Sequence, residues 1–250
     1  MVNVKGRWAL ITGASRGIGY LTAIFMAQQG CNLILHSRTL EGTQKVKAEV
    51  EALGVSAHSV AAELNDLAAV ETMLSQIDAL NVPVDIVLNN AGLQIAYRTE
   101  YLTTPKEDYL VSFNVNTIAP MMICYHFLPK MQERGFGRIL NTTSGISLDP
   151  QQAGYSASKA ALDKVTIDLG MKYEGSNVLI NLTDPGWCRT DLGGQHAPNA
   201  PESAIPGIVV GAFVDDGKCG RFLGAQNFTG MTLEDAVAKA EREFDSPYGK

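Results

Sequence analysis

Short apolar runs alternate with longer amphipathic stretches along most of the chain. The apolar runs are five to eight residues long and rich in Val, Ile, Leu and Ala, as is typical of strands buried on both faces of a parallel sheet. The stretches between them repeat apolar residues every three or four positions, which predicts helices. Alternating strands and helices predict βαβ units. The strands are expected at residues 7–11, 31–36, 55–62, 84–88, 138–142 and 178–182, and the helices at 20–29, 39–53, 67–80, 104–133, 153–173 and 232–244.

The chain after residue 192 follows this pattern less well. Residues 193–207 are rich in Gly, Pro, Ala and polar residues, and we interpret them as a mobile lid over a binding site. Residues 220–224, Gly-Arg-Phe-Leu-Gly, are a poor match to a glycine-rich end after a last strand, so such an end is not clearly predicted. No obvious linker divides the chain, and we expect one domain over residues 1–250.

Composition narrows the class of protein. A net charge of -6 and the lack of a basic run argue against a nucleic-acid partner. No apolar run reaches the roughly 20 residues of a membrane helix, and the N-terminus lacks the apolar core of a signal peptide, so neither membrane insertion nor secretion is expected. The cysteines form no C-x-x-C pair, and we expect no metal site. They predict reduced thiols in a cytoplasmic protein: Cys31, Cys124, Cys188 and Cys219.

A glycine-rich turn follows the first predicted strand. Residues 12–19 read Thr-Gly-Ala-Ser-Arg-Gly-Ile-Gly, and a helical stretch begins directly after them. Gly13, Gly17 and Gly19 let the backbone approach a pyrophosphate, and a helix N-terminus presents N–H groups and partial positive charge to it. The order strand, glycine turn, helix predicts a dinucleotide site.

The end of the second strand indicates which dinucleotide binds. A site that prefers NAD usually carries an acidic residue there for the ribose 2′-hydroxyl. This chain instead has Ser37 and Arg38, and Arg16 lies in the glycine turn. Two guanidinium groups and a hydroxyl suit a 2′-phosphate, which predicts NADP(H). The alternative is that both arginines are solvated surface residues.

Tyr155 and Lys159 form the candidate acid–base pair. They are four residues apart in a predicted helix, which puts them on one face. A free phenol has a pKa of about 10, and a nearby ammonium lowers it. A shift to roughly 7 takes about 4 kcal/mol of differential interaction. Taken alone, the pair is better explained by an amphipathic helix with a solvated lysine.

Three further motifs stand at the ends of later strands. Residues 89–92 read Asn-Asn-Ala-Gly, Ser144 follows the fifth strand, and Pro185 and Gly186 follow the sixth. Together with the glycine turn and Tyr155-x-x-x-Lys159, they occur in the order seen in the short-chain dehydrogenase/reductase family, which the chain resembles from residue 7 to about residue 192. The resemblance implies a Rossmann-type, doubly wound parallel sheet of about seven strands, helices on both faces and a nicotinamide cofactor.

The resemblance also implies roles for single residues. Tyr155 would be the general acid or base, and Lys159 would lower its pKa and hold the nicotinamide ribose. Ser144 would stabilise the oxyanion, and Asn116 would order a proton relay. The residues expected to bind the cofactor are Gly13, Ser15, Arg16, Gly17, Ile18, Gly19, Ser37, Arg38, Glu63, Leu64, Asn89, Ala91, Gly92, Tyr155, Lys159, Pro185, Gly186 and Thr190.

Several of these assignments have rivals in the sequence. Asn114 competes with Asn116, and Asp66 competes with Glu63 for the adenine. Pro120 lacks an N–H for the carbonyl of Asn116, so that carbonyl is expected to be free and the helix kinked there, with a water in the gap. The hydroxyls that could replace Ser144 are those of Thr142, Thr143 and Ser147.

The sequence thus predicts an NADP(H)-dependent carbonyl reductase or alcohol dehydrogenase that acts on a small molecule. The alternatives are a weakly active NADP(H)-binding sensor or interaction module, and a lyase or epimerase on the same fold. The resemblance implies that the two helices that carry Asn116 and Tyr155 pair with those of a second subunit, so a homodimer or homotetramer is expected. These helices also hold more apolar residues than one core-facing stripe needs. These are Met121, Met122, Ile123, Phe127, Leu162, Val165, Ile167 and Leu169.

Overall fold

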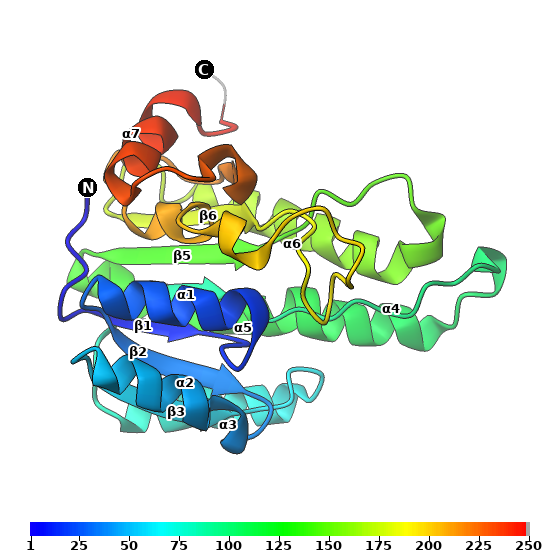
Figure 1. Ribbon diagram of the computed structural model, residues 1–250, viewed down its shortest axis with the longest axis horizontal. Helices are drawn as coiled ribbons and strands as arrows, with labels where there is room; N and C mark the ends of the chain where they lie inside the picture. The colour runs from blue at the N-terminus through cyan, green and yellow to red at the C-terminus, as the bar shows by residue number, and fades with distance from the viewer. Residues whose placement is uncertain (249–250) are drawn as a thin grey trace.

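Seven parallel strands form one sheet in the computed structural model of the protein, which describes residues 1–248 (Figure 1). The strand order is β3-β2-β1-β4-β5-β6-β7, and every neighbouring pair is parallel. The predicted doubly wound sheet is therefore confirmed. The strands are β1 Trp8–Ile11, β2 Asn32–Ser37, β3 Ala57–Ala61, β4 Val84–Asn89, β5 Gly137–Thr142, β6 Val178–Asp184 and β7 Phe222–Gly224.

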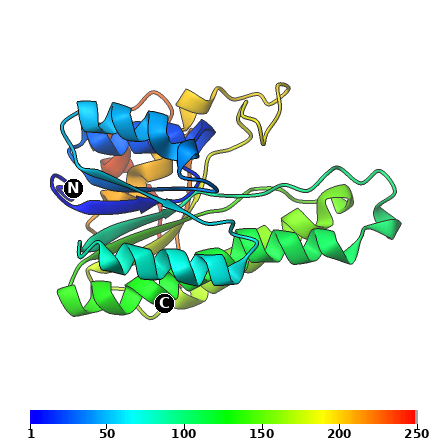
Figure 2. The same cartoon turned by 90° about the horizontal axis from the view of Figure 1, so that it is seen from below.

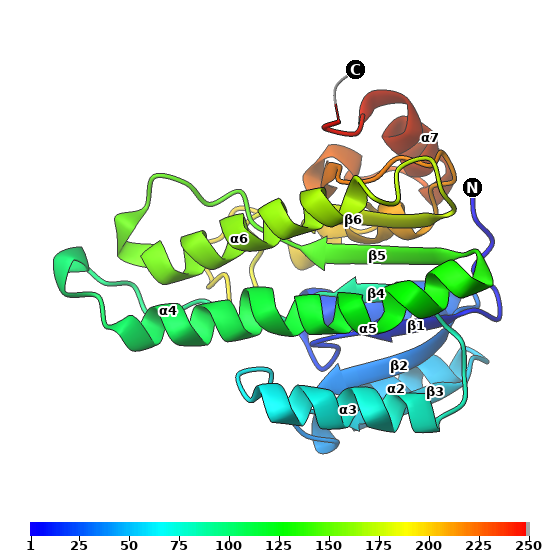
Figure 3. The same ribbon diagram turned by 180° about the vertical axis from the view of Figure 1, so that it is seen from behind.

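Helices cover both faces of the sheet. Figure 1 shows α1 and α2 in front of it, and Figure 3 shows α3, α5 and α6 on the opposite face. None of the helices in residues 1–248 is long and apolar enough to cross a membrane. The helices are α1 Gly17–Gln28, α2 Glu41–Ala52, α3 Leu67–Ala79, α4 Lys106–Phe113, α5 Ala119–Arg134, α6 Ala153–Gly170 and α7 Leu233–Glu243.

The last strand lies within residues 220–224, whose apolar pattern is weak. Phe222–Gly224 is β7 and pairs with the end of β6. The apolar pattern is weak because only Leu223 turns its side chain into the core, whereas Phe222 is exposed. Arg221, which precedes the strand, is fully buried and hydrogen-bonds to Asn181 and Asp216. The expected number of about seven strands is thus confirmed, with a three-residue strand at the edge of the sheet.

The helix departs from α geometry just before Pro120, in a π turn rather than the expected kink (Figures 2 and 3). Residues Asn114–Ile118 form a π-helical turn between α4 and α5, in which the N–H of Ala119 bonds to the carbonyl of Asn114. The two helices still run on as one rod, which extends well beyond the sheet together with the start of α6 (Figures 2 and 3). Turns of this kind often occur at functional sites, and Asn116 lies in the middle of this one.

Residues 193–207 form the connection that the sequence interpreted as a lid. Its base is held by Arg189, whose guanidinium donates to the carbonyls of Ala197 and Pro198. A 3-10 turn, Pro201–Ala204, brings the chain back toward the sheet. Gly193 and Pro201 line the large cavity described below. Its position beside that cavity suits a lid, and its movement stays a prediction.

Candidate active site

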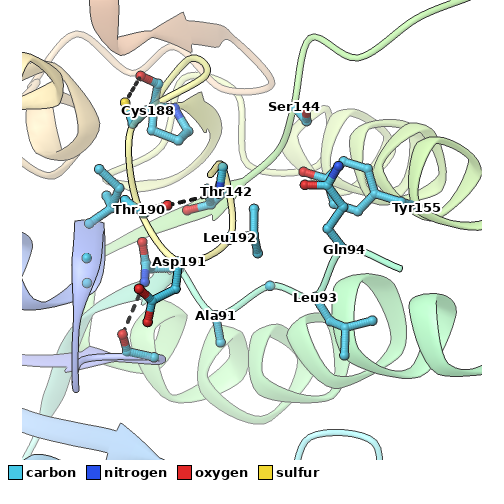
Figure 4. A pocket seen from close by; sticks show the side chains of 18 of the residues that line it. Ala91, Leu93, Gln94, Thr142, Ser144, Tyr155, Cys188, Thr190, Asp191 and Leu192 are labelled. Carbon is cyan, nitrogen blue, oxygen red and sulfur yellow. Dashed lines mark hydrogen bonds between the residues drawn. The ribbon is translucent and has the colours of Figure 1, made fainter. Parts of the chain in front are cut away.

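A cavity of about 1360 Å³ lies at the carboxyl ends of the strands (Figure 4). Its walls come from the connections that follow β1, β2, β3, β4, β5 and β6 and from the start of α6. All the residues nominated above as catalytic or cofactor-binding line it, except Asn89 and Asn116. The nominated residues in its wall are Gly13, Ser15, Arg16, Gly17, Ile18, Gly19, Ser37, Arg38, Glu63, Leu64, Ala91, Gly92, Ser144, Tyr155, Lys159, Pro185, Gly186 and Thr190.

The glycine turn is tied to the connection after β4. Asn90 donates its side-chain amide to the carbonyl of Thr12 at 3.1 Å, and the N–H of Ala91 donates to the Thr12 hydroxyl at 3.0 Å. A Cβ on Gly19 would lie 2.1 Å from the carbonyl oxygen of Gly13, so no other residue fits there. With no side chain at these glycines, the N-terminus of α1 faces the cavity, which fits a pyrophosphate.

His36 holds the same turn from the side of β2. Its Nδ1 accepts the N–H of Gly13 at 3.3 Å, and its Nε2 lies 3.0 Å from the carbonyl oxygen of Ala62. These partners suit a neutral ring with its proton on Nε2. Burial lowers the pKa of His36, which favours the same state. No local pattern pointed to this role beyond the position of His36 at the end of a strand.

Two arginines line the cavity beside the glycine turn and the end of β2. Arg38 is exposed beside Ser37, and Arg16 forms an ion pair of 2.8 Å with Asp191 from the connection after β6. The pair spans the entrance between the glycine turn and Thr190, whose methyl group would lie 3.4 Å from a Cβ on Gly17. Both guanidinium groups line the cavity, which fits an anionic group such as a ribose phosphate.

The structure separates the rival acids after β3. Glu63 lines the cavity. Asp66 caps α3, because its carboxylate accepts the N–H groups of Ala68 and Ala69 at 3.1 and 3.2 Å. Of the two, only Glu63 is therefore in a position to meet a bound adenine.

Ser144 and Tyr155 face the other end of the cavity. Figure 4 shows them away from Thr190 and Asp191, with Gln94 extending toward Tyr155 from the connection after β4. Burial raises the pKa of the Tyr155 phenol, the Ser144 hydroxyl lowers it, and the charge of Asp184 raises it. Ser144 is thus the hydroxyl next to the phenol. Thr142, one of its rivals, instead accepts a hydrogen bond from Lys159 through its backbone carbonyl.

Lys159 lies beside the ring of Tyr155, as the spacing predicted, and its effect on the phenol stays a prediction. Its Nζ lies 6.0 Å from the centre of that ring and also donates to the carbonyl of Thr142 at 2.7 Å. Burial lowers the pKa of Lys159 to about 8, and the charges of Asp163 and Asp184 oppose this shift. A low phenol pKa therefore does not follow from the Tyr–Lys pair alone, because burial acts against the charged form of both groups.

Asn116 supports the site from outside the cavity. Its side-chain oxygen accepts the N–H of Leu93 and its amide donates to the carbonyl of Leu93, both at 2.8 Å, with a further bond to Ser158 at 3.0 Å. It thus fixes the connection after β4 against α6. The rival Asn114 instead bonds to Asn65.

Asn89 lies in the core, which corrects its assignment to the cofactor. Its amide donates to Asn141 at 2.8 Å and to the carbonyl of Pro120 at 3.3 Å, and Asn141 donates in turn to Thr166 at 2.8 Å. This buried chain of polar groups joins β4, β5, α5 and α6. Alternate residues of a strand face opposite sides, so Asn90 takes the place beside the glycine turn.

The chain is similar in sequence to a known family. The sequence model of the family described as short chain dehydrogenase matches residues 7–200. Oxidoreductase UcpA of Salmonella typhimurium is 31% identical over 82% of this chain and 80% of its own length. An uncharacterized oxidoreductase of Mycobacterium tuberculosis is 34% identical over 76% of this chain, and the match spans 57% of that longer relative.

Solved structures share the fold. The 3-oxoacyl (acyl-carrier-protein) reductase of Agrobacterium tumefaciens, with NADP bound, superposes with a TM-score of 0.73 at 28% identity, over 96% of this chain and 91% of that one. A metagenomic short-chain oxidoreductase in complex with NADP gives a TM-score of 0.68 at 29% identity, over 74% of this chain and 84% of that one. The chain belongs to the short-chain dehydrogenase/reductase family.

The protein is expected to become more stable, through Lys159, as the pH rises from about 8 to about 10. The folded chain releases this proton near its lowered pKa of about 8, whereas the unfolded chain keeps it up to the ordinary value of 10.5. The unfolded state then binds more protons, so the free energy of unfolding rises with pH. Urea denaturation of the wild type and Lys159→Met at several pH values measures this. Above about pH 8, the free energy of unfolding of the wild type should rise relative to that of Lys159→Met. The same pH dependence in both proteins would contradict the prediction.

Proposed function

We propose that the protein is an NADP(H)-dependent oxidoreductase that interconverts a carbonyl compound and its alcohol. The observation that supports this most strongly is that Ser144, Tyr155 and Lys159 line one end of the same cavity whose other end carries the glycine turn and two arginines. Groups for acid–base chemistry and groups suited to a dinucleotide phosphate therefore share one space.

The bound nicotinamide would supply or accept the hydride. The Ser144 hydroxyl would donate a hydrogen bond to the substrate oxygen as negative charge develops on it. Tyr155, held neutral by burial, would give that oxygen its proton in the reducing direction. Lys159 would hold the nicotinamide ribose with the N–H groups that it does not use on Thr142. Asn116 would keep the connection after β4 in place for a proton relay.

The cofactor would lie along the glycine turn. The N–H groups at the start of α1 would bind its pyrophosphate, and Glu63 and Leu64 would lie beside its adenine. Arg16 and Arg38 would bind a 2′-phosphate, which favours NADP(H) over NAD(H). Binding would compete with Asp191 for Arg16, because the two now form an ion pair.

Two other functions remain as alternatives for experiment. A weakly active NADP(H)-binding sensor would bind the cofactor but show no turnover, and a lyase or epimerase would act without a net change in nicotinamide absorbance. A panel of ketones, aldehydes, 3-oxoacyl thioesters and alcohols, followed by NADPH absorbance, separates these from an oxidoreductase. The presence of both Ser144 and Tyr155 in the cavity favours the oxidoreductase.

Tyr155→Phe should lower kcat by about 10²–10⁴-fold, because it removes the proton donor and keeps the ring. NADPH affinity, measured by the quenching of tryptophan fluorescence, should change little. If this variant turned over near the wild-type rate, another residue would have to transfer the proton.

Arg38→Asp should abolish or reverse the preference for NADPH over NADH. A hydrogen bond to a charged group contributes about 1.5–3 kcal/mol, so affinity for NADPH should fall by at least about tenfold. The control is Lys45→Asp, which makes the same charge change on α2 outside the cavity wall and should leave both affinities unchanged. Equal wild-type affinity for the two cofactors would rule out the NADP(H) assignment.

We expect at least a dimer, formed through the rod of α4 and α5. Of the apolar residues predicted to pair, Met121, Ile123, Phe127 and Leu162 are buried in the chain's own core. The rod instead exposes another set. Its exposed apolar residues are Tyr109, Leu110, Ile118 and Tyr125, of which the last three have exposed fractions of 59%, 38% and 54%.

Ile118→Glu should therefore lower the mass measured by light scattering at micromolar concentration, because it would bury a charge in the contact. Leu53→Glu, an exposed leucine after α2 on the other face of the sheet, should leave the mass unchanged. A monomer mass for the wild type would refute the assembly.

A further inference from the structure

Asp184 joins two loops at the point where β5 and β6 separate. The last backbone bond between these strands runs from the N–H of Thr143 to the carbonyl of Thr183 at 2.8 Å. Beyond it, one carboxylate oxygen of Asp184 accepts the N–H of Gly145 at 3.0 Å, and the other accepts the N–H of Gly186 at 2.8 Å. The side chain thus continues the pairing after the backbone ladder has ended.

Each of the two amides belongs to a different wall of the cavity. Gly145 directly follows Ser144, whose hydroxyl faces Tyr155. Gly186 forms the turn after β6 and has a φ of 74°, which favours glycine. A Cβ on Gly145 would lie 3.3 Å from the Asp184 carboxylate, so the loop passes close to it. One carboxylate therefore sets the separation between the two walls.

A second carboxylate, that of Asp163, provides a comparison. Asp163 and Asp184 both act on the charge of Lys159, and burial raises the pKa of both carboxyls. Only Asp184 accepts backbone N–H groups from the two loops, whereas one carboxyl oxygen of Asp163 is buried without a hydrogen-bond partner. If the carboxylates act through their charge on Lys159, both residues should matter. If the bonds to the two loops are what matters, only Asp184 should.

We infer that Asp184 is a positioning residue of the oxidoreductase proposed above. Its carboxylate binds the loop after Ser144 to the turn at Pro185 and Gly186, so that the Ser144 hydroxyl keeps a constant position relative to that turn. The inference rests on the proposed function, since only a reaction between these two walls requires that constant position. It concerns the geometry of the walls, and the proton transfer itself stays with Tyr155.

The test is Asp184→Asn, which has the same shape but can accept only one of the two N–H groups. In the wild type without cofactor, the amide of Gly145 should exchange with deuterium at least about tenfold more slowly than an unstructured amide, although the residue is exposed. In Asp184→Asn, the amide of Gly145 or of Gly186 should exchange about tenfold faster. With substrate, kcat should fall about tenfold, the effect of losing one hydrogen bond to a charged group, while KM changes little.

Asp163→Asn is the matched control, because it removes a charge beside Lys159 and leaves both amides bonded. It should not change either exchange rate, and its loss of kcat should be smaller. An unprotected Gly145 amide in the wild type would overturn the inference even if Asp184→Asn did not fold. An equal loss of kcat in the two variants would assign the effect to charge and would also overturn it.

These results are distinguishable from a failure of the proposed function. If the wild type reduces a substrate and Tyr155→Phe does not, the function stands whatever Asp184→Asn does. If no NADPH-dependent turnover is found, protected amides at Gly145 and Gly186 would make the clamp a structural contact only, and both proposals would be rejected.

Discussion

The reversal of strand order between β1 and β4 is the constraint on which the site depends. The chain leaves β1 toward α1 on one face of the sheet and leaves β4 toward α4 on the other. Connections that diverge in this way cannot fill the space above the strand ends, and such crevices bind ligands in open α/β sheets. The glycine turn and the connection after β4 form its two sides, and the bonds of Thr12 with Asn90 and Ala91 hold them together.

Polar side chains carry out most of the positioning around this crevice. His36 and Asn90 hold the glycine turn, Asn116 holds the connection after β4, and Asp184 holds the connections after β5 and β6. In each case a side chain bonds to the backbone of a loop. Loop backbone has no ladder of its own to satisfy its N–H and C=O groups, so these bonds both satisfy the loops and define their shape.

The charges of the site are arranged by depth. Arg16, Arg38 and Asp191 are exposed at the entrance, where water screens them and ligands exchange with them. Lys159 is buried, and its lowered pKa shows how much burial disfavours its charge. The two carboxyls nearest to it have raised pKa values for the same reason.

The amino-acid sequence alone determined the parts of this protein that depend on near neighbours in the chain. The strands and helices follow from local apolar periodicity, the glycine turn from eight consecutive residues, and the shared face of Tyr155 and Lys159 from one helical turn. Pro120 likewise marked an irregular place in the helix by a local rule, although a π turn and not the expected kink is found there. Each of these expectations came from a rule of backbone geometry that needs no knowledge of the rest of the fold.

Only the tertiary structure decided which side chains meet. Asn89 and Asn90 are identical neighbours, and their contacts with β5 and with the glycine turn separate a core residue from a site residue. β7 became visible as a strand only through its pairing with β6. The bond of Lys159 to the carbonyl of Thr142 likewise joins two elements that no local pattern connects. These outcomes depend on groups that are distant in sequence and become neighbours only when the sheet has formed, so no local pattern could specify them.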